Sequence, residues 1–429
     1  MSFRTKAPLL AVTALVSAFG FVSTAYADAF YLQAQSARGA GRAFSGEAAD
    51  TGAASLWWNP AAIAGIRDGS AALSASAIIP RGDVVDTGTQ ICRPGQPCTA
   101  ISGHSSSSNP VNKGIVPSGA VAYPLTDRIA VGLAVTSPFS FTTNYDADSW
   151  ARYTADKTRL RTIDIQPSVA VELTDWLRVG GALNVEYTDA ILSNALPNIL
   201  ASQADGRQEL SGDGWDLGWT AGVQLHNDFA TVGITYKSSI RHKLKGDLVV
   251  SGLVGPLAGG NTAVSGATAE FNTPGQVIVA GRVRATDQLT LNAQVVAFTW
   301  SKFDTIDLGA PLNTAIPENY RDSWSLAGGL DYDVTPKLTV RGGVQRTKTP
   351  TQDGERDARV PDADRWTYAA GGTYQLSSRI AVDAAAQYVD FENTTIDRAT
   401  AAAGSIIRTN GALRDASAIV ASLGARVSF

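Results

Sequence analysis

The two cysteines are the first residues whose type and spacing suggest chemistry. Cys92 and Cys98 flank a turn rich in proline and glycine, and in an exported chain we expect them to form a local disulfide that pins a loop. A metal site would need further ligands, and none lies beside the cysteines. The three histidines, His104, His226 and His242, are scattered along the chain, so we expect no metal site.

Catalytic residues are not indicated by the sequence. Nucleophilic catalysis requires a nucleophile held beside a base, and no nucleophile motif stands out in this chain. His104 and His242 fall in segments that we expect to be loops, and His226 falls at a turn. We therefore expect no enzymatic activity and no cofactor.

The N-terminus has the pattern of a cleaved secretory signal. Residues 1–27 combine a basic start at Arg4 and Lys6, an apolar stretch over 7–21 and a small-x-small site at 25–27. The alternative, a membrane anchor, is disfavoured because the apolar stretch is shorter than the ~20 residues of a spanning helix. We expect export and a mature chain that begins at Asp28.

The composition predicts a membrane β-barrel. Hydrophobic residues make up 44% of the chain, but no run of 18 apolar residues follows the signal. Backbone groups in lipid must be paired within the structure, so an exported chain without spanning helices can cross a membrane only as a closed barrel. Without the signal the formal net charge changes from −4 to −6, which disfavours nucleic acid as a partner. We expect an all-β protein of a bacterial outer membrane.

Alternating apolar and polar residues separated by short turns predict the spans of this barrel. Apolar residues at 177, 179, 183, 185 and 187 alternate with polar ones, as expected for lipid outside and a polar lumen inside. The final strand alternates likewise and ends at Phe429, an aromatic terminus typical of outer-membrane barrels. A soluble β-sandwich is the alternative, but the ~10-residue strands and the long loops on one side only count against it. We predict an antiparallel barrel of fourteen strands, at 68–80, 118–124, 129–142, 159–173, 176–189, 213–226, 229–240, 272–285, 288–302, 321–334, 337–347, 365–376, 379–391 and 416–429.

The segment before the first strand is too irregular to join the sheet. Residues 28–67 are rich in small residues and turns, yet they contain the adjacent Trp57 and Trp58, which need a place to be buried. We expect this segment to fill the lumen as a hatch. The predicted domains are therefore a signal at 1–27, a hatch at 28–67 and a barrel at 68–429.

Two of the long connections carry more apolar residues than solvated loops require. The connection 190–212 has a short, roughly helical apolar pattern, and the connection 241–271 is rich in leucine and valine. Aromatic residues also gather near the loop ends of the predicted strands, and we expect most of them to form an interfacial girdle. These aromatics are Trp150, Tyr153, Trp300, Phe303, Tyr320, Trp324, Trp366, Tyr388 and Phe391.

Six short motifs follow one another along the mature chain. They are Gly-Arg-Ala-Phe-Ser-Gly-Glu-Ala at 41–48, Asn-Pro-Ala at 59–61, the tryptophan-containing segment 212–219, Tyr-Lys-Ser at 236–238, Trp-Ser-Lys-Phe at 300–303 and the segment 360–366. Each motif is weak alone, but their order and spacing together are specific. Through these motifs the whole mature chain closely resembles the FadL/TodX family of outer-membrane transporters for long-chain fatty acids and other hydrophobic compounds.

The resemblance implies that Asn59, Pro60 and Ala61 form a fixed turn within the hatch. Proline fixes φ, and asparagine can bond to nearby backbone groups, so a stiff turn is expected; the alternative is a loop staple without a role in transport. The resemblance also implies lateral exit at a kink in the third strand. We place the kink at Ser137, Pro138, Phe139 and Ser140, because proline cannot donate to the ladder. An ordinary strand end remains the alternative reading of these residues.

The family's capture groove would lie between the two apolar connections. Its expected residues are Leu196, Ile199, Leu200, Leu253 and Leu257. A fatty acid would also need a cation or donor for its carboxylate.

Arg321 matches a basic position of the family that is implicated in carboxylate binding, although it could instead pair with Asp322 or Asp364 in the lumen. A second basic position is lost at Thr188-Asp189-Ala190, which leaves neutral or aromatic hydrocarbons as alternative ligands.

Competing functions and expected partners follow from the barrel prediction. A diffusion porin is the main alternative, although about forty mature residues before the first strand suit a plug rather than an open pore. An outer-membrane lipid-modifying enzyme would need a nucleophile and a base held together, and an adhesive surface protein would need longer and more polar outward loops. The expected partners are a fatty acid or hydrophobic small molecule, outer-membrane lipid and the barrel-assembly machinery, and the expected state is a monomer.

Overall fold

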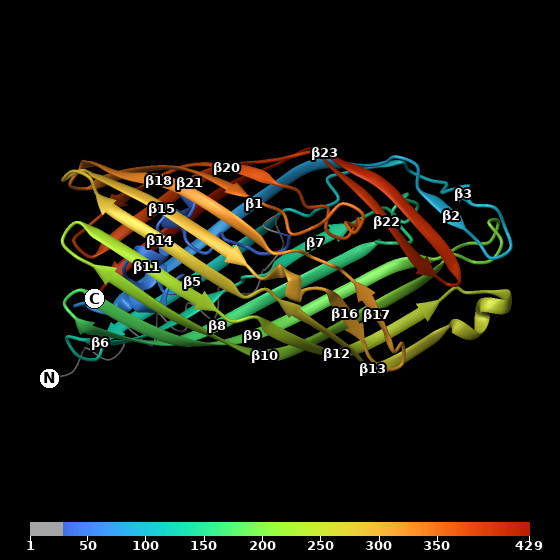
Figure 1. Ribbon diagram of the computed structural model, residues 1–429, viewed down its shortest axis with the longest axis horizontal. Helices are drawn as coiled ribbons and strands as arrows, with labels where there is room; N and C mark the ends of the chain where they lie inside the picture. The colour runs from blue at the N-terminus through green and yellow to red at the C-terminus, as the bar shows by residue number, and fades with distance from the viewer. Residues whose placement is uncertain (1–28) are drawn as a thin grey trace.

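The computed structural model describes residues 29–429 (Figure 1). The expected signal at 1–27 lies outside the described residues. The described chain forms one antiparallel sheet that closes on itself, because β1 (Ser70–Asp86) pairs with both β5 (Gly114–Pro124) and β23 (Ser405–Ser428). The predicted barrel of fourteen strands is confirmed.

Each of the fourteen barrel strands is called a span here. Several spans are interrupted and therefore carry two strand labels in the described sheet. The other spans, in chain order, are β6 (Ile129–Thr136) with β7 (Ser140–Asn144), β8 (Lys157–Thr174), β9 (Leu177–Leu196), β10 (Gly206–His226), β11 (Ala230–Lys237) with β12 (Ile240–Ser251), β13 (Thr262–Thr273) with β14 (Gln276–Arg284), β15 (Leu289–Phe298) with β16 (Thr305–Leu308), β17 (Thr314–Pro317) with β18 (Ser323–Thr335), β19 (Leu338–Thr347), β20 (Arg365–Gln375), and β21 (Ile380–Phe391) with β22 (Thr394–Ala402). Three short strands at the long-loop end, β2 (Gln90–Cys92), β3 (Thr99–Ala100) and β4 (Ser106–Ser108), and two 3₁₀ helices, η5 (Gly255–Gly260) and η6 (Trp300–Lys302), complete the elements after residue 68.

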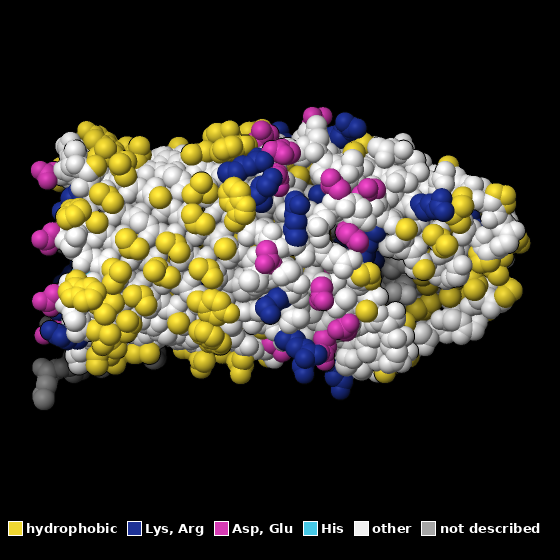
Figure 2. Space-filling view, in the orientation of Figure 1, with side chains coloured by type: hydrophobic (Ala, Val, Ile, Leu, Met, Phe, Trp, Pro, Cys, Tyr) yellow, Lys and Arg dark blue, Asp and Glu magenta, His cyan; other side chains and the backbone are white. Residues whose placement is uncertain are grey.

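The outer surface has the alternation that the sequence predicts. Leu183 and Leu217 on neighbouring strands are exposed, whereas Asn184 points inward and is buried. Figure 2 shows hydrophobic side chains over the part of the barrel near its short turns and a band of charged side chains beside them. No helix among the described residues is long and apolar enough to cross a membrane. An apolar outer band bounded by charges is what a barrel in lipid requires.

The two apolar connections are mostly strand, which corrects our expectation of a helical pattern in 190–212. β9 continues to Leu196 and β10 begins at Gly206, so the loop between them is confined to residues 197–205. In the same way, β12 and β13 occupy most of 241–271 and leave the short helix η5 at the tip. Beyond the apolar band these strands still pair with each other, and this pairing satisfies their backbone hydrogen-bonding groups.

Six of the nine aromatic residues expected in a girdle are instead buried. Only Trp324, Trp366 and Tyr388 are exposed on the outer surface. The six buried residues are Trp150, Tyr153, Trp300, Phe303, Tyr320 and Phe391. Several of these rings pack against the N-terminal segment rather than against the membrane interface.

The N-terminal segment, residues 29–67, lies inside the barrel. It contains the short helix α2 (Ala37–Ala40) and the 3₁₀ turns η2 (Glu47–Ala49), η3 (Ala53–Ser55) and η4 (Pro60–Ile63). Its parts contact strands on different sides of the wall: α2 lies against β20 and β21, η2 against β11 and β14, and η4 against β8, β9 and β10. Almost all of its side chains up to residue 64 are buried, including both tryptophans.

Candidate ligand channel

An apolar cavity lies at the level where the strands extend above the apolar band. Its empty space, including open solvent, is about 720 Å³. The residues that line it come from the N-terminal segment, from β7 to β10, from β12, β13 and β16, and from the connections that contain Phe303, Glu318 and 359–360. They are mainly apolar and include Phe30, Phe141, Leu160, Leu192, Leu210, Leu244, Phe271, Phe303 and Ile306.

Three charged residues also line this cavity, and each has a partner of opposite charge. Arg159 lies 2.7 Å from a carboxylate oxygen of Asp189, and Arg359 lies 2.8 Å from Asp357. Glu318, in the connection between β17 and β18, lies 3.6 Å from Arg398. The two arginines are therefore paired with aspartates at the edge of the cavity, Glu318 lies near an arginine, and the wall is apolar over most of its surface.

The Glu318 carboxyl is held mainly in its neutral form. Burial, reinforced by the charge of Asp357 and opposed by Arg398, raises the pKa of Glu318 to about 8. The pKa of the neighbouring Tyr320 is also raised, chiefly by burial and then by Glu318. A neutral carboxyl is compatible with the apolar surroundings at neutral pH.

Phe30 connects the cavity to an aromatic cluster beneath it. Its ring centroid lies 4.8 Å from that of Trp300, 5.2 Å from Phe303 and 5.6 Å from Phe141. Because Phe30 belongs to the N-terminal segment, a movement of that segment would change the floor of the cavity.

The third span is interrupted between β6 and β7. Thr136 pairs with Asp164 and Ser140 pairs with Arg161, so three residues of this span oppose two residues of β8. This is the geometry of a bulge. The predicted kink residues, Ser137 to Ser140, occupy this position.

The same interruption also separates the third span from β5. Pairing between β5 and β6 ends at Gly119 and Val135, although β5 continues to Gly114 as a partner of β1. The wall is joined again beyond the interruption, where the backbone N–H of Asn112 donates to Thr142. The ladder between β5 and the third span is therefore broken over the kink.

The N-terminal segment supplies the hydrogen bonds that the kink lacks. The N–H of Leu32 donates to the carbonyl of Pro138 at 2.7 Å, and the N–H of Ser140 donates to the carbonyl of Phe30 at 2.9 Å. The Gln35 side chain donates to the carbonyl of Ser137 at 2.7 Å. The kink and the start of the N-terminal segment are thus hydrogen-bonded to each other.

Asn59 fixes a turn deeper in the segment. Its side-chain oxygen accepts from the N–H of Ala61 at 2.9 Å, and its amide donates to the carbonyls of Ala48 and Val223. Pro60 follows as the first residue of η4. The Asn59–Ala61 turn therefore joins two parts of the segment to the wall strand β10.

An ionic cluster attaches the segment to two further wall strands, β14 and β18. The fully buried guanidinium of Arg42 pairs with Glu47, with Asp50 at 2.6 Å and with Asp331 of β18 at 3.0 Å. Arg282 of β14 bridges the same two aspartates, at 3.1 Å from each. Buried charges are tolerated only when they are paired in this way.

Glycines on the wall make room for the segment. A methyl group added at Gly343 would collide with the backbone of Arg42, and one at Gly222 would collide with the side chain of Asn59. Glycine permits this close backbone approach because it has no Cβ. Sequence reasoning did not identify these positions, since nothing local distinguishes them from other strand glycines.

The five leucine and isoleucine residues expected in the groove lie at the hairpin tips, and none of them lines the described apolar cavity. Leu196 and Leu253 are buried, whereas Leu200 is exposed. Ile199 and Leu257 are partly exposed. The side chain of Asn198 joins the two tips through the carbonyl of Gly252 and the N–H of Val254, both at 3.0 Å.

Arg321, which the resemblance led us to expect at a carboxylate-binding position, is exposed and does not line the described cavity. The cavity arginines are Arg159 and Arg359, which sequence reasoning missed. Each arginine forms an ion pair with an aspartate, and no local sequence pattern indicates that either arginine faces the lumen.

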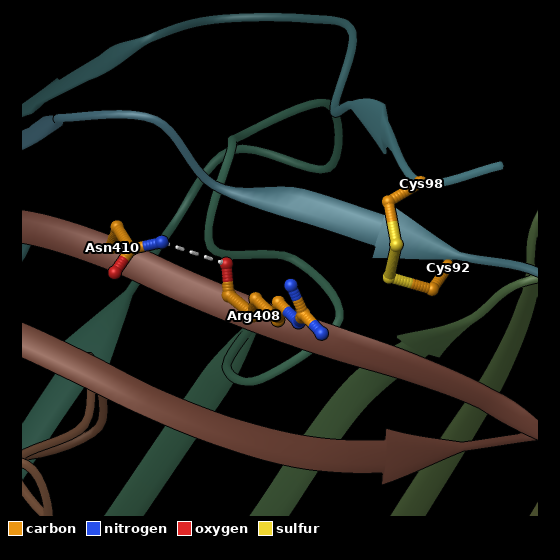
Figure 3. The surroundings of a disulfide bond; sticks show 4 residues. All are labelled: Cys92, Cys98, Arg408 and Asn410. Carbon is orange, nitrogen blue, oxygen red and sulfur yellow. Dashed lines mark hydrogen bonds between the residues drawn. A yellow bond between two sulfur atoms is a disulfide. The ribbon is translucent and has the colours of Figure 1, made fainter.

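Cys92 and Cys98 are joined by a disulfide at the β2–β3 hairpin (Figure 3). β2 also pairs with β23, where Cys92 lies opposite Ile406. Between the cysteines, Arg93 donates to the carbonyl of Asn198 at 3.1 Å and Gln96 donates to the carbonyl of Ile199 at 2.9 Å. The disulfide loop therefore rests on the tip of the β9–β10 hairpin.

Comparison with known proteins agrees with this architecture. The family model described as outer membrane protein transport protein (OMPP1/FadL/TodX) matches residues 19–429. The long-chain fatty acid transport protein of Escherichia coli O6:H1 is 25% identical, over 95% of this chain and 96% of that protein. The crystal structure of a Pseudomonas aeruginosa FadL homologue superposes with a TM-score of 0.82 at 25% identity, covering 93% of this chain and 99% of that one. The Ralstonia pickettii toluene transporter TbuX shares the fold, with a TM-score of 0.67 at 19% identity over 92% of this chain and 99% of its own.

Proposed function

Because the chain belongs to the OMPP1/FadL/TodX family of outer membrane transport proteins, we propose that it takes up long-chain fatty acids or other hydrophobic compounds. The family consists of outer-membrane transporters of fatty acids and hydrophobic aromatic compounds, and the barrel belongs in the bacterial outer membrane. The observation that carries the proposal is the apolar cavity, which is lined on one side by Phe30 of the N-terminal segment.

Capture would begin between the β9–β10 and β12–β13 hairpins. Both hairpins contribute apolar side chains to the cavity, through Leu192 and Leu210 on one side and Leu244 and Phe271 on the other. Leu196, Leu253 and Leu257 at the tips would make the first apolar contacts. Burial of a long alkyl chain along this path is favourable by ~0.8 kcal/mol for each methylene.

The N-terminal segment would act as the hatch of this channel. The Arg42 cluster and the Asn59–Ala61 turn attach its middle to the wall, so we propose that movement is concentrated in residues 29–35. Withdrawal of Phe30 would open the floor of the cavity. The same movement would remove the hydrogen bonds that Leu32 and Ser140 contribute at the kink.

We propose lateral exit where the third span is interrupted. Support comes from the broken ladder between β5 and the kink and from Pro138, which has no N–H to donate there. An apolar ligand that leaves through the wall enters lipid directly and avoids the aqueous end of the barrel.

The ligand can be a fatty acid or a neutral hydrocarbon. A fatty acid carboxylate would compete with Asp189 for Arg159 or with Asp357 for Arg359, because both cations are already paired. A neutral hydrocarbon needs only the apolar wall. Uptake of one compound from each class therefore distinguishes the two ligands.

The test is uptake of labelled oleate and labelled hexadecane by cells with and without the protein, together with conductance of the purified protein in a planar bilayer. We expect protein-dependent uptake of at least one compound and little conductance, because the N-terminal segment fills the lumen. Large stable pores that do not respond to either compound would instead identify a diffusion porin.

A further inference from the structure

A second described cavity lies deeper in the barrel and shares no lining residue with the first. Its empty space, including open solvent, is about 330 Å³. Trp57 of the N-terminal segment, Pro138 and Phe139 of the kink, and the strands β8, β9 and β11 border it. It contains a cluster of buried charged side chains, Asp164, Glu186 and Lys237.

Lys237, the last residue of β11, has an ammonium group with unused hydrogen-bonding capacity. Its side chain lines the cavity, and the residue is only 7% exposed. The ammonium lies 3.9 Å from the centre of the Trp57 ring, a cation–π contact that uses none of its N–H groups for a conventional hydrogen bond. Among the described residues Lys237 Nζ has no hydrogen-bond partner. Buried ammonium groups are costly unless they are hydrogen-bonded, so this donor is suited to a ligand.

Two buried carboxylates face the same cavity. Asp164 accepts a hydrogen bond from Asn184 at 2.7 Å through one of its oxygens. Glu186 has one oxygen without a hydrogen-bond partner among the described residues, 3.6 Å from Nε2 of His242. The cavity thus offers a donor at Lys237 and an acceptor at Glu186.

We propose that this cavity binds the head group of a fatty acid in its protonated form. The carbonyl oxygen would accept from Lys237, and the O–H would donate to Glu186 or Asp164. An ionised carboxylate would be repelled by two acidic side chains, and an ester would lack the proton to donate. Trp57, Pro138 and Phe139 supply apolar surface for the first methylenes of the chain.

This inference rests on the proposed uptake of hydrophobic compounds and adds a second binding site to it. The site borders the kink through Pro138 and Phe139. A fatty acid released through the wall enters lipid more readily when it is neutral, because charge in lipid is strongly disfavoured. A site that selects the protonated head group beside the kink would favour that release.

The first test measures binding by carbon-13 NMR of dodecanoic acid labelled at its carboxyl carbon. The full mature protein is placed in lipid nanodiscs, either unchanged or as Lys237→Met, with Lys113→Met on the exposed surface as the matched control. We expect two bound carboxyl signals for the unchanged protein and for Lys113→Met. Lys237→Met should retain only the signal from acid bound in the first, apolar cavity.

The second test compares uptake of dodecanoic acid with uptake of its methyl ester. Lys237→Met should lower uptake of the acid by about tenfold or more, the range for loss of a charge-assisted hydrogen bond. Uptake of the ester should stay within about twofold of that of the unchanged protein, because the ester does not use the full site. Heat-modifiable migration in a gel verifies that each variant is folded, and Lys237→Leu, which also lacks a donor, replaces Lys237→Met if the latter does not fold.

The outcomes separate the two proposals. Two signals retained in Lys237→Met, or equal losses of acid and ester uptake, would overturn the second site and leave Lys237 a structural or water-binding residue. Absence of dodecanoic acid binding in the unchanged protein would overturn the second site, and absence of protein-dependent uptake of the acid, of its ester and of hexadecane would overturn the proposed function itself.

Discussion

Leu32 donates its backbone N–H to the carbonyl of Pro138 across 2.7 Å, so the N-terminal segment is hydrogen-bonded to the barrel wall where the third span is interrupted. Pro138 has no N–H of its own to offer a neighbouring strand, and the ladder to β5 ends before it. The N-terminal segment therefore takes the place of a missing strand. In the proposed mechanism, opening of the cavity floor and exposure of the kink would be one coupled movement.

Replacement of Pro138 should reveal this coupling. Pro138→Val adds an N–H and removes the fixed φ, so the third span can pair more continuously with its neighbours. We expect uptake of oleate to fall by roughly tenfold, a barrier increase of ~1.4 kcal/mol, with unchanged surface binding. Pro167→Val on β8 is the matched strand-proline control. Unchanged uptake in Pro138→Val would argue against lateral exit at the kink.

The close approach of Arg42 to Gly343 should make this glycine essential for the packing of the N-terminal segment against the wall. Gly343→Val would force the side chain into the backbone of Arg42, and overpacking of this kind costs about 1–3 kcal/mol. We expect higher conductance in planar bilayers and greater sensitivity of cells to a large hydrophilic antibiotic. At Gly328 an added Cβ would meet no heavy atom within 4 Å, so Gly328→Val should behave like the unchanged protein. Equal conductance of the two variants would contradict this account.

Ionisation of Glu318 should weaken binding of a neutral ligand in the apolar cavity that it lines. Burial raises the pKa of Glu318 to about 8, above its ordinary value of 4.5, so the folded protein keeps the proton between these values. The contribution of this group to stability therefore decreases as pH rises from about 4.5 to 8. Above pH 8 the new charge attracts water to the apolar wall.

Calorimetry with a neutral hydrocarbon from pH 6 to 9 checks this prediction. Affinity should fall above pH 8 in the unchanged protein and stay level in Glu318→Gln, which cannot ionise. The same fall in both proteins would assign the effect to another group. Arg321→Ala should leave the whole profile unchanged, because Arg321 is exposed and does not line the cavity.

The disulfide loop should restrain the tip of the β9–β10 hairpin. Arg93 and Gln96 donate to the carbonyls of Asn198 and Ile199, and the disulfide restricts the loop that carries both donors. In the variant with Cys92→Ser and Cys98→Ser we expect amides at 197–205 to exchange hydrogen at least about tenfold faster. Amides of β20 and β21 serve as the internal reference. Unchanged exchange at the tip would show that the loop does not hold it.

The sequence by itself determined the barrel and its outer surface. Alternation such as Leu183 and Asn184 depends only on the period-two geometry of a strand and on lipid as the outer solvent, so it can be read locally. The cysteine pair, six residues apart, was equally local. The helical pattern in 190–212 misled us because Leu192 and Leu196 share one face in a helix and also in a strand.

The tertiary structure decided which side chains meet across the lumen. Phe30 meets Phe139 and Trp300, and Lys237 meets Trp57, although each pair is far apart in sequence. These contacts depend on strand register, on closure of the sheet and on the path of the N-terminal segment. A one-residue change of register would turn every inward side chain outward, and that choice is made by the whole barrel rather than by any one strand.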